Sequence, residues 1–410
     1  MTAQDARNVN ISDVNGGGED PYSFYAQLRK ECPVAKVRQG NGMDVYLVTR
    51  FEDAKEALCD ARLAKDPRHG AAMLAASGVP LPKEGGAKLA GQMLASDPPE
   101  HTRLRRLVSK EFTVRRVERM REHIQALADQ LADDLAGRLE NGRGVVDLVA
   151  DYAFPLPMAV IAELLGIPLA DKDKFRAWSQ AVLLPLGAPG KAEGAREFSG
   201  YLATLMEAKK ADPGDDLFSA LAVAAEDDRL SPDELIGTAI LMIIAGHDTT
   251  VNLIANGMLA LVRHPDQLKL LRDSPAMLPD AIDEFLRYDA PLERASARWA
   301  VEDMEIAGTF IPKGSFVSVV LGSANRDENV FGDGDRLDLT RQENHRHLAF
   351  GRGIHHCIGA PLAKLEGELA IGTLLRRFGS FELAVDPGEL RWRQSIVMRS
   401  LESLPVRVSV

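Results

Sequence analysis

Residues 345 to 359 read HRHLAFGRGIHHCIG and place Cys357 among four histidines and three glycines. The thiol has three interpretations: a zinc ligand, an inert core thiol, or a thiolate that holds a reactive metal group. Apolar residues recur at helical spacing from Leu362 to Phe378, so a helix is expected to begin directly after the cysteine. A thiol at a helix N-terminus is favoured as thiolate, because the positive end of the helix dipole stabilises the charge.

The glycines around the cysteine allow unusual backbone conformations. Gly351 and Gly353 permit tight or left-handed turns, and such turns can aim backbone N–H groups at a sulfur. Gly359 lets the backbone approach a flat, bulky group. A cysteine thiolate that ligates heme iron needs access, charge stabilisation and close approach, and this loop offers all three.

A zinc site is the competing interpretation of the same loop. Its tetrahedral ligands would come from Cys357 and the four nearby histidines: His345, His347, His355 and His356. The other two cysteines, Cys32 and Cys59, are far away in the sequence, so neither a disulfide framework nor a CxxC zinc motif is expected. Zinc explains neither the glycine spacing nor the polar turn described next.

A long apolar helix is expected in the middle of the chain. It begins at Ser231, which has Pro and Glu at the positions of a capped helix start, and it runs to Pro265. Its length of about 45 to 50 Å suits a helix that crosses the protein interior. The uninterrupted apolar stretch ends at His247 after about a dozen residues, fewer than the roughly 20 that a bilayer needs.

The centre of this helix carries a polar turn. Gly246 weakens a helix, and Asp248 places a charge where burial is costly. In the simpler interpretation, Thr249 hydrogen-bonds back to the carbonyl of Ala245 and Asp248 pairs with an arginine. In the functional interpretation, the helix opens locally, admits water and lines a proton path from Asp248 through Thr249.

Composition limits the classes of partner. The 410 residues are 45% hydrophobic and 27% charged, as in an ordinary soluble globular protein. A formal net charge of -11 argues against non-specific nucleic-acid binding and against an anionic membrane surface. Residues 1 to 20 look flexible and lack the features of a signal peptide, so a cytoplasmic protein is expected.

The remaining pattern predicts a mainly α fold with a minor β portion. A hairpin is expected around residues 34 to 50, and short strands are expected at 295 to 320 and in the last thirty residues.

The cysteine loop resembles the heme-binding loop of the cytochrome P-450 monooxygenases. The matching pattern F-G-x-G-x-H-x-C-x-G is formed by Phe350, Gly351, Gly353, His355, Cys357 and Gly359. AGHDTT, residues 245 to 250, is similar to the oxygen-activating stretch of that family's central helix, with Ala245 against the heme. Together with the features below, the resemblance covers nearly the whole chain and implies a single P-450 heme domain over 21 to 410, with the long helix across heme b.

Two further elements resemble the family. Glu284 and Arg287 in DEFLRY are similar to its ExxR pair, and Arg341 in GDRLDLTR is similar to the second arginine partner of that pair. Taken alone, such an i,i+3 pair has a simpler interpretation as a solvated helix face.

The resemblance also implies which residues bind the cofactor. Cys357 would ligate the iron, and four basic residues would hold the heme propionates: His101, Arg105, Arg298 and His355. Arginine suits this role because its planar fork meets a carboxylate at two points.

The implied reaction inserts one oxygen atom from O2 into a hydrophobic small molecule. Cys357 would donate electron density to the iron, Thr249 would hydrogen-bond the bound oxygen or a water beside it, and Asp248 would relay protons. A heme-thiolate protein that binds or rearranges a ligand without activating O2 is the alternative.

Partners also follow from the resemblance. The heme domain accounts for the chain, so electrons are expected from a separate ferredoxin and ferredoxin reductase, and the enzyme is expected to be a monomer. The ferredoxin would dock on a basic face near the cysteine: Arg103, Arg105, Arg106, Lys110, Arg346 and Arg352.

The expected substrate pocket is apolar, which suits a hydrophobic ligand. Its predicted lining is Ile243, Ile244, Leu292, Ala295, Ile396 and Val397. Glu293 and Arg294 are expected mainly to solvate a loop. The closest resemblance, in AGHDTTVNLIANGM, is to bacterial enzymes that oxidise macrolides and other polyketides; steroids, terpenoids and xenobiotic-like molecules are the alternatives.

Overall fold

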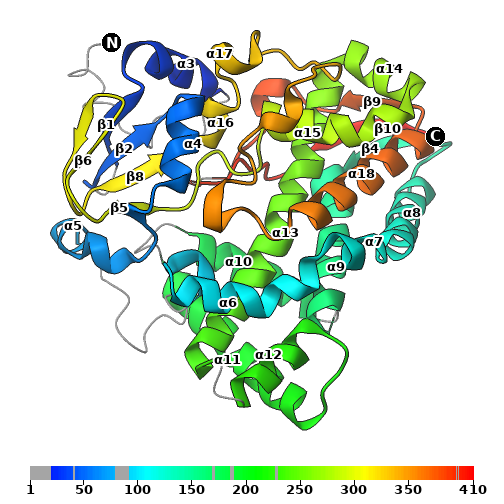
Figure 1. Ribbon diagram of the computed structural model, residues 1–410. Helices are drawn as coiled ribbons and strands as arrows, with labels where there is room; N and C mark the ends of the chain where they lie inside the picture. The colour runs from blue at the N-terminus through cyan, green and yellow to red at the C-terminus, as the bar shows by residue number, and fades with distance from the viewer. Residues whose placement is uncertain are drawn as a thin grey trace.

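A computed structural model describes residues 20–39, 42–78, 92–168, 171–184, 189–226, 230–393, 395 and 397–410. Figure 1 shows a mainly helical protein whose small sheets lie to one side and at one end, so the predicted fold class is confirmed. Residues 1–19 lie outside the described part of the chain. The division into a flexible N-terminus and one heme domain stays a prediction.

The helices have the following bounds. They are α3 (Tyr22–Glu31), α4 (Phe51–Cys59), α5 (Ala71–Ala76), α6 (Glu100–Val108), α7 (Val114–Glu118), α8 (Arg121–Gly137), α9 (Pro155–Leu165), α10 (Lys172–Leu183), α11 (Lys191–Ala211), α12 (Leu217–Glu226), α13 (Pro232–Arg263), α14 (Pro265–Asp273), α15 (Leu278–Tyr288), α16 (Leu321–Ala324), α17 (Glu328–Phe331) and α18 (Ala360–Arg377).

The strands are short. They are β1 (Val34–Arg38), β2 (Asp44–Val48), β3 (Leu63–Ala64), β4 (Arg143–Asp147), β5 (Arg298–Ala300), β6 (Met304–Ile306), β7 (Thr309–Ile311), β8 (Phe316–Val319), β9 (Ser380–Leu383) and β10 (Pro405–Ser409). They form a five-stranded sheet in the order β1-β2-β8-β5-β3, a three-stranded sheet β4-β10-β9, and the pair β6-β7.

The five-stranded sheet joins distant parts of the chain. The predicted hairpin is present, with β1 antiparallel to β2 from Val34 opposite Val48 to Arg38 opposite Asp44, although residues 40–41 of its turn lie outside the described residues. β2 pairs in parallel with β8, so the N-terminal hairpin lies beside the segment that follows α15. β8 also pairs antiparallel with β5, and this second pairing places Arg298 of β5 at one edge of the central cavity.

Helix α13 runs through the middle of the protein (Figure 1). Its N-terminus has the predicted capping box, in which Ser231 and Glu234 accept from each other's backbone N–H groups. Its 32 residues correspond to about 48 Å. By length and composition it is able to span a membrane, but 78% of its most apolar window is buried inside the protein, as in a core helix.

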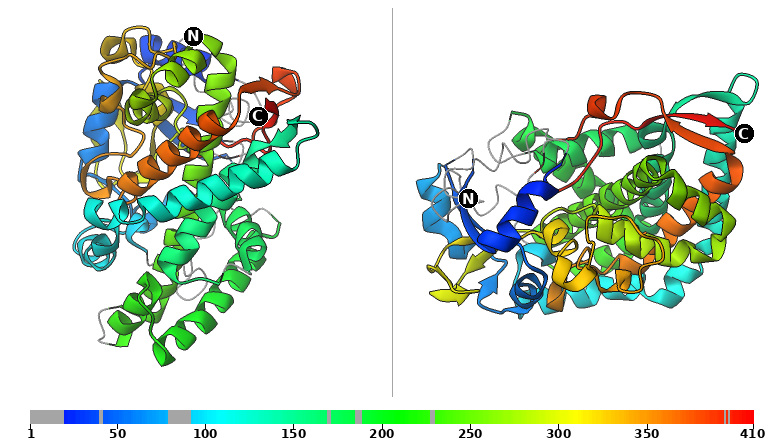
Figure 2. Two further views of the ribbon diagram at one scale, coloured as in Figure 1. Left: turned by 90° about the vertical axis from the view of Figure 1, so that its right-hand side faces the viewer. Right: turned by 90° about the horizontal axis from the view of Figure 1, so that it is seen from above.

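The polar turn does not open helix α13. The helix is continuous from Pro232 to Arg263, so the predicted local opening is wrong. Gly246 has a packing reason instead: a Cβ atom there would lie 2.5 Å from the Cδ1 atom of Ile161 in α9. Glycine at position 246 therefore permits close contact between α9 and α13. Figure 2 shows the packing of the helices from two further sides.

Candidate heme site

The cysteine loop is held in a tight conformation at the start of α18. Gly351 and Gly353 have φ angles of +68° and +73°, in the region that favours glycine. The Cys357 N–H donates to the carbonyl of Phe350 at 2.8 Å, and the sulfur accepts from the backbone N–H groups of Gly359 and Ala360. The thiol thus lies at a helix N-terminus with donors aimed at it, as the sequence predicts.

These donors do not make Cys357 a thiolate by themselves. Burial raises the pKa of the thiol, while the N–H groups of Gly359 and Ala360 and the charge of Arg105 lower it by a smaller amount. The helix terminus thus favours the thiolate, as expected, but burial has the larger effect on the pKa of this thiol. A bound cation reverses this balance, because a thiol that coordinates a metal loses its proton.

A cavity of about 340 Å³ lies between α13 and the cysteine loop, within the range of about 300 to 1,000 Å³ of ligand pockets. Cys357 faces it from one side, and Ala245 and Thr249 of α13 face it from the other. Most of the remaining lining is apolar, including Leu241, Leu253, Leu362 and Ala363. The sulfur is accessible to this cavity although it lies inside the protein.

Basic side chains with unused nitrogen atoms lie together at one edge of the cavity. His101 is 3% exposed, and neither of its ring nitrogens has a hydrogen-bond partner among the described residues. Its ring lies 4.3 Å from that of His355, whose Nε2 also has no partner in the described part of the chain. Arg298 donates to the carbonyls of Leu58 and Leu63, but its Nε has no partner within the same described ranges. Because buried polar atoms are normally paired, this edge needs an acceptor from a ligand.

The positive charge at this edge also favours a bound anion. Burial lowers the pKa of His355 to about 2 and that of Arg298 to about 10. Burial also lowers the pKa of His101 and Arg105. The two carboxylates of heme b would supply acceptors and negative charge here, so these residues fit that group.

Lys65, in the segment after β3, belongs to the same edge and was missed from the sequence. Its Nζ donates to the carbonyls of Ser296 and Ala297 at 2.9 and 3.3 Å, and burial lowers its pKa well below the usual value. Lys65 and His355 both line the cavity, and the charge of Lys65 lowers the pKa of His355 further. No local motif identifies it, because the sheet brings residues 65 and 296 together.

The polar turn of α13 is divided between two environments. Thr249 faces the cavity, and its hydroxyl donates to the carbonyl of Ala245 at 2.9 Å. Asp248 does not line the cavity; it is buried, with Oδ1 3.4 Å from Nε2 of His247. Burial lowers the pKa of the nearby Arg393, and the carboxylate of Asp248 raises it. The structure therefore brings only one of the two predicted residues directly into the cavity.

Four of the residues predicted to form the apolar pocket line the cavity: Ile244, Leu292, Ala295 and Val397. Ile243 does not, so its assignment is wrong; it lies in the hydrophobic core, because it is on the other side of α13 from Ala245 and Thr249. Ile396 lies outside the described residues. The cavity is also lined by Met93, Leu94, Leu183, Leu241, Met242 and Met398. Counting back from Thr249 in steps of four identifies Leu241.

Glu293 and Arg294 do not solvate a loop, and that prediction is wrong. They are 5% and 1% exposed. Arg294 donates to the hydroxyl oxygen of Tyr25 at 2.7 Å, and this hydroxyl donates to Glu293. The network connects α3 to the loop beside the cavity.

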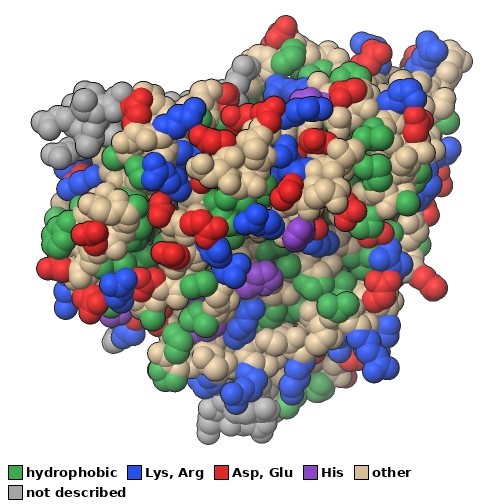
Figure 3. All heavy atoms as spheres, turned by 45° about the horizontal axis from the view of Figure 1, so that its top comes forward, with side chains coloured by type: hydrophobic (Ala, Val, Ile, Leu, Met, Phe, Trp, Pro, Cys, Tyr) green, Lys and Arg blue, Asp and Glu red, His purple; other side chains and the backbone are tan. Residues whose placement is uncertain are grey.

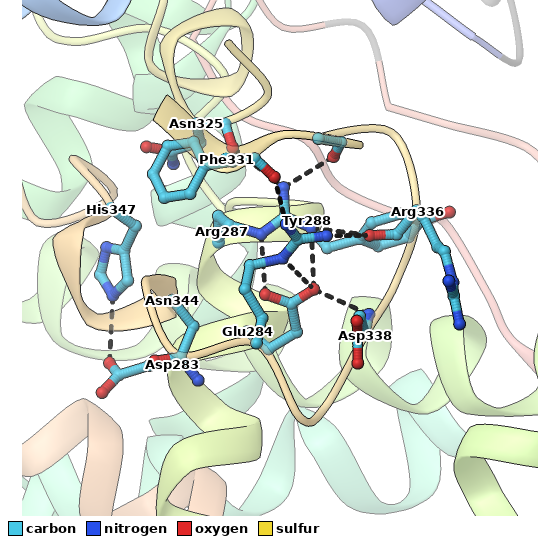
Figure 4. Close-up of polar contacts among 12 residues, drawn as sticks. Asp283, Glu284, Arg287, Tyr288, Asn325, Phe331, Arg336, Asp338, Asn344 and His347 are labelled. Carbon is cyan, nitrogen blue, oxygen red and sulfur yellow. Dashed lines mark hydrogen bonds and ion pairs between the residues drawn. The ribbon is translucent and has the colours of Figure 1, made fainter. Parts of the chain in front are cut away.

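Glu284 and Arg287 form the centre of a second buried network (Figure 4). Arg287 donates to both carboxylate oxygens of Glu284 at 2.7 and 2.8 Å, and both residues are fully buried. The Asp338 N–H donates to Glu284 at 2.9 Å, and Arg341 lies 3.5 Å from the same oxygen. The interpretation as a solvated helix face is wrong. Arg287 also donates to the carbonyls of Asn325 and Gly334, so the network fixes the chain between α16 and the cysteine loop.

The zinc interpretation is wrong for the described residues, which contain no group of three or more His, Cys, Asp or Glu side chains able to hold a metal ion. His347 instead lies 3.1 Å from Asp283 (Figure 4), and His345 is exposed. His355 and His356 both line the cavity, and His355 lies at its basic edge beside His101.

Three features together define a heme-thiolate enzyme: a cysteine at the start of a helix, a core helix across a cavity, and a basic edge of that cavity. The sequence model of the family Cytochrome P450 matches residues 195–402. The chain belongs to this family: it is a heme-thiolate monooxygenase with heme b as its cofactor.

Two curated relatives and one solved structure give the degree of similarity. Cytochrome P450 monooxygenase PikC of Streptomyces venezuelae is 46% identical, over 95% of this chain and 91% of its own. The 6-deoxyerythronolide B hydroxylase of Saccharopolyspora erythraea is 44% identical, over 95% and 96%. The cytochrome P450 enzyme CxnD, for C–S bond formation in chuangxinmycin biosynthesis, has a TM-score of 0.88 at 40% identity, over 95% of this chain and 94% of its own.

Proposed function

We propose that this monooxygenase hydroxylates or epoxidises a macrolide or a related polyketide. The observation that carries the proposal is the cavity between Cys357 and Thr249, whose lining is mainly apolar apart from its basic edge. Such a lining suits a large hydrophobic substrate. A relative at 44% identity is named for hydroxylating 6-deoxyerythronolide B, and other relatives act on polyketides.

The residues have distinct proposed roles. The heme, when bound, supplies the activation of O2 with two electrons and the insertion of one oxygen atom. Cys357 would hold its iron, and His101, Arg105, Arg298 and His355 would bind its carboxylates. Phe350, Gly351 and Gly359 shape the loop against it, and Ala245 leaves space on the opposite side.

Thr249 and Asp248 act on protons. The Thr249 hydroxyl faces the cavity, where it holds a water or the reacting oxygen by a hydrogen bond. Asp248, on the adjacent side of α13, passes protons toward that hydroxyl. Leu292, Ala295 and Val397 exclude bulk water and orient the apolar substrate.

Electrons come from a partner, and we propose that this partner is a ferredoxin with its reductase. Arg106, Lys110, Arg346 and Arg352 are exposed near the cysteine loop. Figure 3 shows Lys and Arg side chains beside His and apolar side chains on one face of the molecule. Arg103 contributes less than expected, because it pairs with Glu234. A monomeric, cytoplasmic enzyme is part of the same proposal.

Substrate class is tested by a binding and turnover panel. Macrolide and linear polyketide compounds are expected to shift the heme absorption spectrum and to yield products that have gained one oxygen atom. Steroids, terpenoids and small aromatic compounds serve as controls. Tight binding and oxidation of a steroid or terpenoid, with none for any polyketide, would contradict the proposed substrate class. A product formed by bond coupling without added oxygen would contradict the proposed reaction.

Replacing Thr249 with alanine is expected to separate reductant consumption from product formation. The hydroxyl is a polar group of α13 that faces the cavity, so its loss removes a local hydrogen-bonding group. Product per reductant should fall by at least about 10-fold, because a positioned acid or base contributes about 10² to 10⁴ in rate. The missing reducing equivalents should appear as peroxide.

The matched control is Thr238→Ala in the same helix. The Thr238 hydroxyl is buried, has no hydrogen-bond partner and does not line the cavity. Its loss should leave coupling unchanged. Equal coupling in wild type and Thr249→Ala would remove Thr249 from the mechanism.

Reversing the charge of Arg352 is expected to weaken ferredoxin docking. Arg352 is exposed in the cysteine loop, and docking on a basic face depends on long-range attraction. Arg352→Glu should raise the ferredoxin concentration needed for half-maximal turnover by about 10-fold at low salt, with a smaller effect at high salt. Arg196→Glu on the exposed face of α11 is the control. An equal response of both variants would exclude this docking face.

A further inference from the structure

His247 and Asp248 form a buried pair beside the cavity. His247 is 0% exposed and Asp248 is 8% exposed. The Nε2 atom of His247 lies 3.4 Å from Oδ1 of Asp248. Neither side chain lines the cavity, although Gly246 and Thr249 on either side of the pair do.

The hydrogen bonds of His247 define its tautomer. Its Nδ1 lies 2.7 Å from the carbonyl oxygen of Ile243, one turn earlier in α13. A carbonyl oxygen only accepts, so Nδ1 carries a hydrogen. In a neutral ring Nε2 then has no hydrogen and presents a lone pair.

Two acceptors would then face each other in a buried site. Among the described residues, Nε2 of His247 has no hydrogen-bond donor, and neither has Oδ2 of Asp248. A neutral ring beside an ionised carboxylate places two lone pairs together in a buried site, where electrostatic repulsion is strong. One proton at either Nε2 or Oδ1 turns this repulsion into attraction.

We propose that His247 and Asp248 hold one exchangeable proton between them, and that His247 is a positioning residue that stores this proton next to Thr249. The inference rests on the proposed function, in which Asp248 supplies protons to the cavity. It adds His247 as the partner that keeps a proton available to the Asp248 carboxylate.

The surrounding charges are compatible with a pair that carries one proton. Arg393 faces Asp248 and attracts it, and Arg176 and Glu402 act in turn on Arg393. Arg176 lies 4.4 Å from the ring of Phe154, which meets His247 edge-on at 6.0 Å. Arg393 thus places a positive charge beside the pair, and Nε2 of His247 and Oδ1 of Asp248 are the two positions for the shared proton.

The transfer conserves protons and changes no electrons. The one stored proton moves from Nε2 of His247 to Oδ1 of Asp248, and Asp248 releases it to a water or hydroxyl in the cavity. The pair is then one proton short, with two acceptors facing each other. This repulsion favours uptake of one proton from solvent, which restores the starting state.

The stored proton is tested without turnover in the heme-loaded, reduced enzyme with bound carbon monoxide. This form is diamagnetic, so ¹⁵N-histidine resonances are measurable, and His247→Gln identifies the resonances of His247. We expect either a protonated Nε2 on His247 or a carboxylic-acid infrared band that Asp248→Asn removes. A bare Nε2 together with no such band at neutral pH would overturn the proposal.

His264 is the internal control in the same helix. Its Nδ1 also lies close to the carbonyl of the residue four positions earlier, Ala260, at 2.8 Å, but its side chain is not in an ion pair with a carboxylate. The ring resonances of both histidines are recorded in the same sample, and only those of His247 should change in Asp248→Asn.

Turnover then tests the role of the stored proton. His247→Leu should lower product per reductant by about 10-fold, because general-acid supply is lost. His247→Gln keeps a donor but no exchangeable ring proton, so its coupling should lose the pH dependence of the wild type. His264→Gln should behave as the wild type.

The outcomes separate the two proposals. A shared proton with normal coupling and normal pH dependence in both His247 variants overturns the positioning role and leaves the proposed function intact. Normal coupling in Asp248→Asn and Thr249→Ala contradicts the proposed proton supply itself.

Discussion

Replacing Cys357 with alanine is expected to abolish the heme-thiolate signature and monooxygenase activity. The sulfur is the side-chain ligand that the cysteine loop presents to the cavity, with the N–H groups of Gly359 and Ala360 directed at it. Thiolate ligation favours O–O cleavage, so a variant without it loses the chemistry even where heme remains bound. The measurement is the optical difference spectrum of the reduced protein with carbon monoxide, together with product formation.

Cys59→Ala is the matched control, because Cys59 is an exposed free thiol that lies close to the same loop. It should retain the thiolate spectrum and full activity. A normal thiolate band in Cys357→Ala would contradict the assignment of the axial ligand and the site built around it.

Replacing Glu284 with glutamine is expected to cause the largest loss of stability. The substitution keeps the shape of the side chain but leaves Arg287 as a buried charge without its partner, and both residues are 0% exposed. Breaking a buried ion pair costs about 3 to 5 kcal/mol. Because the network also fixes the segment before the cysteine loop, heme retention should decrease with stability. Chemical unfolding followed by heme absorbance and by circular dichroism measures both effects.

Glu207→Gln provides the same substitution in an ion pair of the same i,i+3 spacing. Glu207 pairs with Lys210 at 2.7 Å on α11, but its side chain is 73% exposed. An exposed pair contributes about 0 to 1 kcal/mol. If the two variants had similar unfolding free energies, Glu284 would have no special structural role.

The structure also changes how the polar turn is understood. The simpler interpretation of Thr249 is correct in its geometry, because the hydroxyl donates to the carbonyl of Ala245. This bond does not remove Thr249 from the cavity, so the structural and functional interpretations hold together. Asp248 is on the adjacent side, beside His247 and near Arg393. A proton path must therefore pass around the helix rather than through an opening in it.

Local sequence determined the parts of the site that depend on neighbouring residues. Glycines at 351 and 353 imply left-handed turns, and the apolar spacing after Cys357 implies a helix that begins there; both are present. Ser231 and Glu234 similarly predict the start of α13. Caps, turns and dipoles act over only a few residues, so a short segment contains the information.

The tertiary structure alone decided which side chains meet. Ile243 and Ile244 are equally apolar, but only Ile244 faces the cavity. Lys65 reaches the basic edge because β3 pairs with β5, and Arg294 is buried because Tyr25 of α3 packs against it. Burial and charge pairing depend on contacts between segments more than two hundred residues apart, and no local pattern records such contacts. The sequence therefore determined the thiol and its helix, whereas the packing of distant elements decided the cavity, its charge and the placement of Arg393 near Asp248.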